Sequence, residues 1–190
     1  TLNVSSVNDP PSFATGDGKL TTAIGSSNDY CYSVAVLPDG KILLIGTTFI
    51  GSNADFALVR YNADGSLDTT FSSNGIVTTA IGLSYDLGNN GTVQPDGKIL
   101  VAGSAKMGST DDFALVRYNA DGSLDTTFSG DGIVTTAIGW SHDHGYSVKI
   151  QTDGKILVAG DTYNGKNFDL ALVRYSADGS LDTTFSGDGI

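Results

Sequence analysis

Glutamate is absent from this chain, because all 21 acidic residues are aspartate. Aspartate favours turns and helix caps, whereas glutamate suits helix interiors, so this absence argues against a helical protein. The 25 glycines are equally unsuited to helix interiors. Threonine, valine, isoleucine and aromatic residues are spread along the whole chain, and this composition predicts an all-β fold.

Basic residues are scarce as well, and the formal net charge is −11. Surfaces that bind phosphate backbones need clustered lysine and arginine, so we expect no nucleic-acid partner. The chain has no apolar run of about 18 residues, so we expect no membrane insertion. The single cysteine, Cys31, cannot form an internal disulfide. Its counterparts in the repeats described next are Gly88 and Gly145, which predicts a small, buried thiol.

The sequence repeats at a constant interval: the motif DGK begins at Asp39, Asp96 and Asp153, and ALVRY begins at positions 57, 114 and 171. Both motifs thus return with the same 57-residue period, and a period of this size indicates a repeat architecture. On this count the chain consists of a head at 1–15, repeats at 16–72, 73–129 and 130–186, and the start of a further repeat at 187–190.

Each repeat contains four predicted strands, which in the third repeat are Gly132–Ile138, Tyr146–Gln151, Lys155–Gly160 and Leu170–Tyr175. The third-repeat strand KILVAG is continuously apolar, as in a strand covered on both faces. Hairpin-like turns separate the strands. Four antiparallel strands per repeat, in tandem, predict blades of a β-propeller-like fold. A β-solenoid is the alternative, and the hairpin turns disfavour it.

Three features of the strands carry further expectations. Gly46, Gly103 and Gly160 end the most buried strand of each repeat, which predicts crowding near a central axis. The segment Asn89–Gln94, NNGTVQ, is rich in poor strand formers, so the second repeat is expected to be the weakest. Variable loops are expected at 47–54, 104–111 and 161–168.

The stretch GYSVKIQTDGKILVAG, followed by LALVRYSADGSLDTTFSGDGI, resembles the delta-60 repeat, a family of tandem repeats in large bacterial secreted or surface proteins. The resemblance covers residues 16–190. It implies a propeller-like β fold and an extracellular or cell-surface location, and it supplies no catalytic residues.

The head of the chain does not fit the repeat. Its stretch NVSSVNDPP resembles the last strand and linker of cadherin-like modules. In such linkers an Asn-Asp pair helps to bind calcium, so the resemblance makes Asn8 and Asp9 candidate calcium ligands. A capped turn before Pro10 and Pro11 is the other interpretation.

The repeated motif NADGSLD has two interpretations. Its side-chain oxygens alternate as in calcium loops, although the chain has no bidentate glutamate. A type I turn with glycine at the left-handed position also fits, with Asp68 paired across strands to Arg60, and we favour it. The calcium candidates are Asn62, Asp64, Asp68, Asn119, Asp121, Asp125, Asp178 and Asp182.

The segment SHDHGY places His142 and His144 two residues apart, on one face of a strand. Such a pair could bind zinc, but a zinc site needs three or four ligands. The counterparts Tyr85 and Leu87 favour a variable loop instead. Asp143 recurs as Asp29 and Asp86, so we expect these carboxylates to order each loop through backbone hydrogen bonds.

No catalytic motif is evident, so we expect a non-enzymatic structural or adhesive segment of an extracellular protein. A lectin-like module that binds glycans through Trp140, Tyr85 and Tyr163 is the alternative. Closed propellers have four to eight blades. We therefore expect further repeats or further copies as partners, with Lys19–Ile24 of one copy completing the blade that ends near Ile190 of another.

Overall fold

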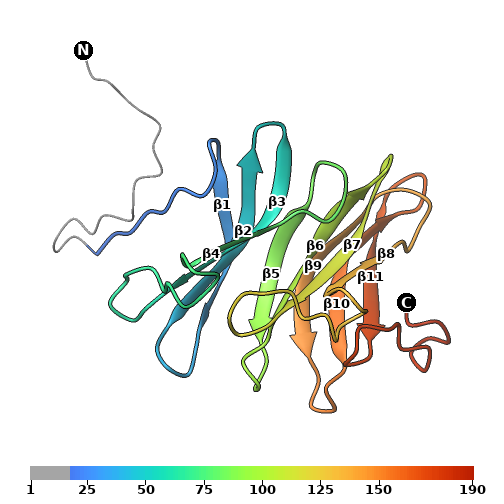
Figure 1. Ribbon diagram of the computed structural model, residues 1–190. Coiled ribbons are helices and arrows are strands. Elements are labelled where there is room, and N and C mark those ends of the chain that lie inside the picture. The colour runs from blue at the N-terminus through green and yellow to red at the C-terminus, as the bar shows by residue number, and fades with distance from the viewer. Residues whose placement is uncertain (1–17) are drawn as a thin grey trace.

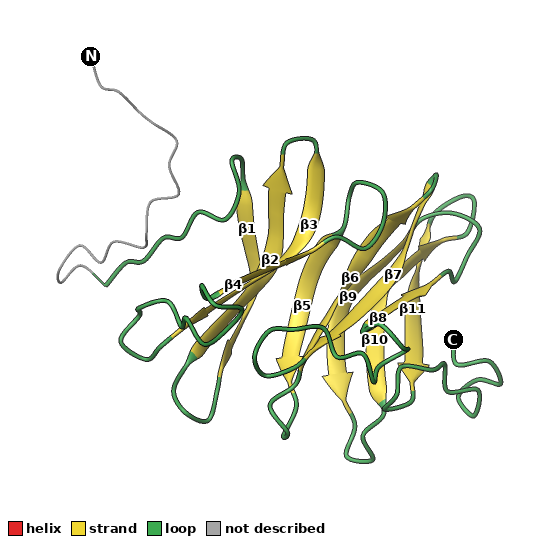
Figure 2. Cartoon of the chain, in the orientation of Figure 1, coloured by secondary structure: helices red, strands yellow, loops and turns green. Residues whose placement is uncertain are grey.

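The computed structural model describes residues 18–190, and this range contains strands and no helix (Figures 1 and 2). The first sheet consists of β1 (Asp29–Val36), β2 (Ile42–Ile50), β3 (Asn53–Tyr61) and β4 (Ile76–Thr79). The second consists of β5 (Leu87–Val93), β6 (Ile99–Met107), β7 (Thr110–Tyr118) and β8 (Ile133–Thr136). The third consists of β9 (Asp143–Ile150), β10 (Ile156–Tyr163) and β11 (Phe168–Tyr175).

All strand pairs within the sheets are antiparallel, and each sheet is a meander of sequential strands. Figure 2 shows the three sheets arranged side by side like open blades, without closing into a ring. The all-β, propeller-like prediction is confirmed. The solenoid alternative is wrong, because a solenoid needs parallel pairing between successive coils.

The expected variable loops are largely strand. β2 and β3 run on until only Gly51 and Ser52 separate them, and β6 and β7 are joined by Gly108 and Ser109 in the same way. In both turns the glycine has positive φ, at +64° and +72°, as a two-residue hairpin turn requires. Polar residues such as Thr47, Thr48 and Ser104 interrupt the apolar run here without regular alternation, so the sequence pattern did not predict the strands.

The strand GIVTTAI belongs to a different sheet from the one its place in the repeat suggests. We expected it as the first strand of its repeat, but β8 pairs with β7 of the preceding sheet, with Phe113 opposite Thr136. β4 pairs with β3 in the same manner. The sheets are therefore offset from the repeats, because a sequence period sets the length of a unit but not where its sheet begins.

The core lies between the sheets. One cluster joins the first and second sheets around Phe56, Leu58 and Tyr118, and the other joins the second and third sheets around Phe113 and Val158, all of them fully buried. β5 packs against the first sheet, and β9 packs against the second. Burying large apolar side chains between facing sheets is the main favourable contribution to stability in such a stack.

Gly46, Gly103 and Gly160 lie inside β2, β6 and β10, so the expectation that they end their strands is wrong. They are crowded by neighbouring strands, not by a central axis. A Cβ on Gly103 would lie 1.9 Å from the carbonyl oxygen of Leu87, and one on Gly160 would lie 1.8 Å from that of His144. In each case the register shifts next to the glycine. A β-bulge thus brings the backbones into contact, and only glycine fits.

β5 is more deeply embedded than its composition suggests. The amide of Asn90 donates to Ser33 Oγ of the first sheet, and its carbonyl accepts from Val148 N of the third, at 3.3 and 3.2 Å. Asn89 donates to the carbonyl of Gly145 at 2.8 Å. A Cβ on Gly91 would lie 2.3 Å from Ile45 Cδ1. The residues that looked unsuited to a strand fit it between two sheets.

We therefore reverse the expectation that the second repeat is the weakest. Amide hydrogen exchange should be slower at 88–93 than at 31–36, by about tenfold or more, because β5 is covered on both faces whereas Val34 of β1 is 62% exposed. Exchange measured by mass spectrometry checks this. Faster exchange in β5 than in β1 would restore the original expectation.

Cys31 is exposed, so the prediction of a buried thiol is wrong. Gly88 and Gly145 occupy the same repeat position, and a Cβ there would meet the carbonyls of Gly46 and Gly103 at 2.6 and 2.7 Å. In those repeats the preceding sheet covers the position. In the described residues no sheet covers Cys31, because β1 belongs to the first sheet of the stack.

Candidate functional site

The NADGSLD motif forms a hairpin clamp that recurs in all three repeats. In the second repeat the Asp125 carboxylate accepts hydrogen bonds from Arg117 Nε at 2.6 Å, Lys98 Nζ at 2.7 Å and Thr127 Oγ1 at 2.7 Å. The Arg117 guanidinium also stacks on Phe128, 4.4 Å from the ring centroid. The expected pairing of Asp68 with Arg60 is present, with Nε 2.7 Å from Oδ2.

The clamp also joins one repeat to the next. Arg117 Nη1 donates to the carbonyl of Ala177 at 2.6 Å, 60 residues along the chain. Ser129 N donates to the carbonyl of Asp178 at 2.9 Å. Gly179 packs on the Phe128 ring, where a Cβ would lie 2.9 Å from Cε2. The first and second clamps thus hold the turn of the following repeat, which gives the recurring motif a structural role between repeats.

The clamp carboxylates have lowered pKa values. Burial alone would raise the pKa of Asp125, but the hydrogen bonds from Lys98 and Thr127 and the charge of Arg117 outweigh it. The same holds for Asp68, with Lys41, Thr70 and Arg60. For Asp182, hydrogen bonds from Lys155 and Thr184 are the main causes of the lowered pKa.

These shifts predict loss of stability in acid. A carboxylate with a depressed folded-state pKa contributes stability that is complete above its ordinary value of 3.8 and is lost as the pH falls through the folded-state pKa. The free energy of unfolding should therefore vary little between pH 7 and 5 and decline below about pH 4. Urea denaturation at pH 7, 5 and 3 measures it. Equal stability at pH 3 and 7 would contradict the prediction.

The turn interpretation of the motif agrees with the geometry. Ser66 N and Ser66 Oγ donate to Asp64 Oδ1 at 2.9 and 2.7 Å, and Gly65 has a φ of +83°. Asp121 and Asp178 bond Ser123 and Ser180 likewise. Calcium binding at these hairpins stays a prediction, and it would compete with the cations already paired to Asp68, Asp125 and Asp182. Asn8 and Asp9 lie outside the described residues.

The recurring loop aspartates act as we expected. Asp143 Oδ2 accepts from the backbone N of Ile138 at 2.8 Å, and Asp86 Oδ2 accepts from Ile81 at 2.6 Å. Asp29 Oδ2 accepts from Ile24 at 2.9 Å. These bonds order the loop that leads into β1, β5 and β9, and so fix the two histidines that flank Asp143.

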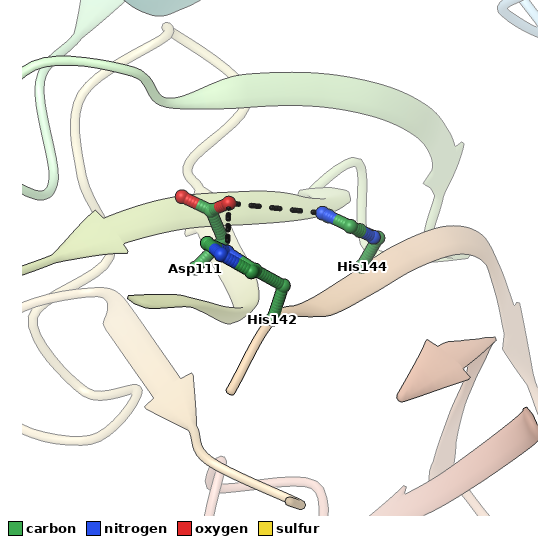
Figure 3. Close-up of side chains that lie close together, drawn as sticks. All are labelled: Asp111, His142 and His144. Carbon is green, nitrogen blue, oxygen red and sulfur yellow. Dashed lines mark hydrogen bonds and ion pairs between the residues drawn. The ribbon is translucent and has the colours of Figure 1, made fainter. Parts of the chain in front are cut away.

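Figure 3 shows His142 and His144 facing Asp111, which reaches them from β7 of the neighbouring sheet. His142 Nδ1 lies 2.6 Å from Asp111 Oδ2, and His144 Nε2 lies 3.8 Å from the same oxygen. The three ligand atoms all lie within 4.8 Å of one another, and no other such group of three occurs among residues 18–190. Asp111 is the third ligand that sequence reasoning lacked, and it belongs to the strand of a different sheet.

Two neighbours hold this cluster in place. Asp161 Oδ1 lies 3.0 Å from His144 Nδ1, and Lys106 Nζ lies 3.3 Å from Asp111 Oδ1. A bond from Nδ1–H to Asp161 leaves Nε2 of His144 with its lone pair directed toward Asp111. The cluster borders a hollow of about 210 Å³ that Tyr85 also lines. Two imidazoles and a carboxylate can bind a divalent cation or exchange protons.

The other two loop aromatics lie elsewhere. Trp140 is fully exposed, and with Tyr163 it lines a hollow of about 670 Å³ beside Thr162 and Asn164. Tyr85 lines the separate hollow beside Asp111 and His144. The three aromatic residues expected to bind sugars therefore form no single site.

Comparison with protein families supplies the classification. The family model described as "Domain of unknown function (DUF5122) beta-propeller" matches residues 37–71, 94–128 and 151–185, which together make up more than half of the chain. The chain belongs to this family. Each matched DUF5122 segment runs from a DG turn through the second and third strands to the clamp phenylalanine, and the expected delta-60 type repeat is confirmed.

Comparison of the DUF5122 chain with curated proteins finds no match. Among solved structures it is similar to an endo-arabinase from Bacteroides thetaiotaomicron, at 13% sequence identity and a TM-score of 0.44. The similarity covers 78% of the chain and 56% of the endo-arabinase.

Among the described residues there is no helix that is long and apolar enough to span a membrane.

Proposed function

We propose that this chain is a non-enzymatic structural or adhesive segment of an extracellular bacterial repeat protein, and that its sheets stack on further sheets of the same repeat. The main support is one repeat position whose side chain is buried in the first two repeats and exposed in the third. Phe56 and Phe113 are fully buried against the following sheet, whereas Leu170, at the same repeat position, is 97% exposed. Leu172 is likewise exposed where Leu115 is buried.

The opposite face of the stack shows the complementary pattern. Val148 of β9 is fully buried against the second sheet, whereas Val34, its counterpart in β1, is 62% exposed. The face around Leu170 and the face around Val34 therefore correspond to two surfaces that pack together inside the stack. Contact between them would be head to tail, which gives a ring or a filament according to its rotation.

The edge of the third sheet supports the same partner. Among the described residues β11 has no outer strand beside it, although β3 and β7 pair with β4 and β8. Thr22 forms a hydrogen bond with the Tyr61 hydroxyl, as Thr79 of β4 does with Tyr118. Residues 18–24 thus take the place of a fourth strand without joining a sheet. An open strand edge is a template for such a strand from a copy or an adjoining repeat.

The remaining parts of the proposal rest on charge and resemblance. The carboxylates with the most strongly lowered pKa values, Asp68, Asp125 and Asp182, belong to ion pairs that hold hairpins. Their perturbed titration therefore has a structural cause, which favours a non-enzymatic role. The extracellular location rests on the similarity to repeats of large secreted bacterial proteins.

Light scattering after size exclusion tests the stacking. The chain should associate at micromolar concentration, and Leu170→Asp or Val34→Asp should shift it toward a monomer. Leu83→Asp is the matched control, because Leu83 is 76% exposed on a loop outside both faces. A stable wild-type monomer, or equal effects of all three substitutions, would count against the proposal.

A glycan-binding module is the second candidate, because exposed Trp140 and Tyr163 share one hollow with the polar side chains of Thr162 and Asn164. Sugar faces stack on aromatic rings while their hydroxyls need polar partners. A glycan array should then show binding that Trp140→Ala removes and Tyr85→Ala preserves, since Tyr85 lies in the other hollow. An array without binding would reject this candidate.

A further inference from the structure

We propose that Asp111, His142 and His144 form a binding site for a late first-row divalent cation such as Zn²⁺, which would link the second sheet to the third. Asp111 lies in β7, His144 lies in β9, and His142 immediately precedes β9. The site is independent of the stacking proposed above, because none of the three residues lies on the outward faces around Leu170 and Val34.

The geometry needs one proton shift and small side-chain movements to accept a metal. His142 Nδ1, which donates to Asp111 Oδ2, must give up its proton so that Nε2 carries the proton of the neutral ring instead. Zinc–nitrogen bonds of about 2.0–2.1 Å place neighbouring tetrahedral ligand atoms about 3.3 Å apart. The 2.6 Å separation of His142 Nδ1 from Asp111 Oδ2 must open, and the 3.8 Å separation of His144 Nε2 from that oxygen must close. Each movement is about 0.5–0.7 Å, which side-chain rotation supplies.

The surroundings suit a cation. The carboxylate of Asp161 at His144 Nδ1 fixes the ring and its tautomer, as carboxylates do for metal-binding histidines. Lys106 engages Asp111 Oδ1 and leaves Oδ2 for the metal. With neutral imidazoles, the charges of Asp111, Asp161 and Lys106 leave the cluster with one net negative charge before a divalent cation binds.

The ligand types select the metal class. Imidazole nitrogens suit zinc, copper, nickel and iron, whereas calcium prefers oxygen ligands. The side chains of His142, His144 and Asp111 are 39%, 24% and 22% exposed, so water can complete the coordination.

The repeat itself does not demand these residues. The equivalent positions between the first and second sheets are Ala54, Tyr85 and Leu87, none of which has an imidazole or carboxylate side chain. The cluster is therefore additional to the framework that the three repeats share, which makes a binding role for it separable from folding.

Calorimetric titration of the untagged chain with ZnCl₂ tests the site. We expect one Zn²⁺ per chain, and at a hundredfold excess over Kd a rise in Tm of about 5 °C or more. Asp111→Asn, His142→Gln and His144→Gln should each remove this binding. Asp161→Asn should weaken it about tenfold.

Two controls keep the result decisive. Asp131→Asn should bind zinc normally, because the chain already has Asn74 at the equivalent position. Since His142 and His144 are the only histidines, Co²⁺ should broaden both imidazole NMR signals in the folded protein. No zinc binding at about 1 mM ZnCl₂, or unchanged binding in the histidine variants, would overturn the proposal. Calcium should leave the two imidazole signals unmoved, and a calcium-induced shift would also overturn it.

Discussion

Replacing Gly103 with alanine should prevent the second sheet from forming in its native register. The added Cβ would lie 1.9 Å from the Leu87 carbonyl oxygen and 2.8 Å from Phe56 Cζ. Neither neighbour can yield, because Leu87 is fixed in β5 beside a bulge and Phe56 is fully buried between the sheets. We expect a loss of more than about 4 kcal/mol of unfolding free energy, measured by urea denaturation and circular dichroism.

Gly108→Ala is the matched control for this substitution. Gly108 has a φ of +72° and no neighbour within 4 Å of an added Cβ, so only backbone strain of about 1 kcal/mol opposes alanine there. If Gly103→Ala proved no more destabilising than Gly108→Ala, β5 and β6 would be free to separate at the bulge.

Replacing Arg117 with alanine should have the next largest effect. The side chain is 8% exposed and pairs with Asp125, and it also bonds the Ala177 carbonyl and stacks on Phe128. Its loss leaves the buried Asp125 carboxylate with Lys98 as its only cation among the described residues. We expect a loss of about 3 kcal/mol and a fall in Tm of about 6–12 °C in thermal denaturation.

Arg174→Ala separates the ion pair that the clamp arginine forms within its own hairpin from the bond that Arg117 forms with the following repeat. Arg174 forms the same pair with Asp182 and stacks on Phe185, but its side chain is 19% exposed and bonds no turn of another repeat among the described residues. Its removal should lower Tm by clearly less than removal of Arg117. Equal decreases would show that the bond to the Ala177 carbonyl contributes nothing to stability.

The clamp illustrates what a local pattern can predict. Asp68 and Arg60 are eight residues apart on a hairpin whose turn is specified by Asn62, Asp64 and Gly65. Their pairing follows from strand geometry once the turn is assigned, and it could be predicted. The bond from Arg60 to the Ala120 carbonyl could not, because it depends on how two repeats pack.

The candidate metal site shows the opposite case. The two histidines were visible in sequence as a pair on one strand face, but Asp111 joins them only because β7 and β9 lie in adjacent sheets. The next residue, Asp112, has the same side chain, yet it lies outside the cluster. Nothing in the distance along the chain to His142 distinguishes the two carboxylates.

The all-β class, the repeating unit, its four antiparallel strands and the turns that contain Asp-Gly could be predicted from the sequence. These features depend on residues close together in the chain, where alternation and turn chemistry act directly. Only the packing of the sheets fixes which sheet takes GIVTTAI, that Cys31 is exposed, that Asn89 and Asn90 bond β5 to the neighbouring sheets, and that Asp111 meets the histidines. Each of these depends on which face of one sheet covers another, and packing between repeats is not encoded in the period of the sequence.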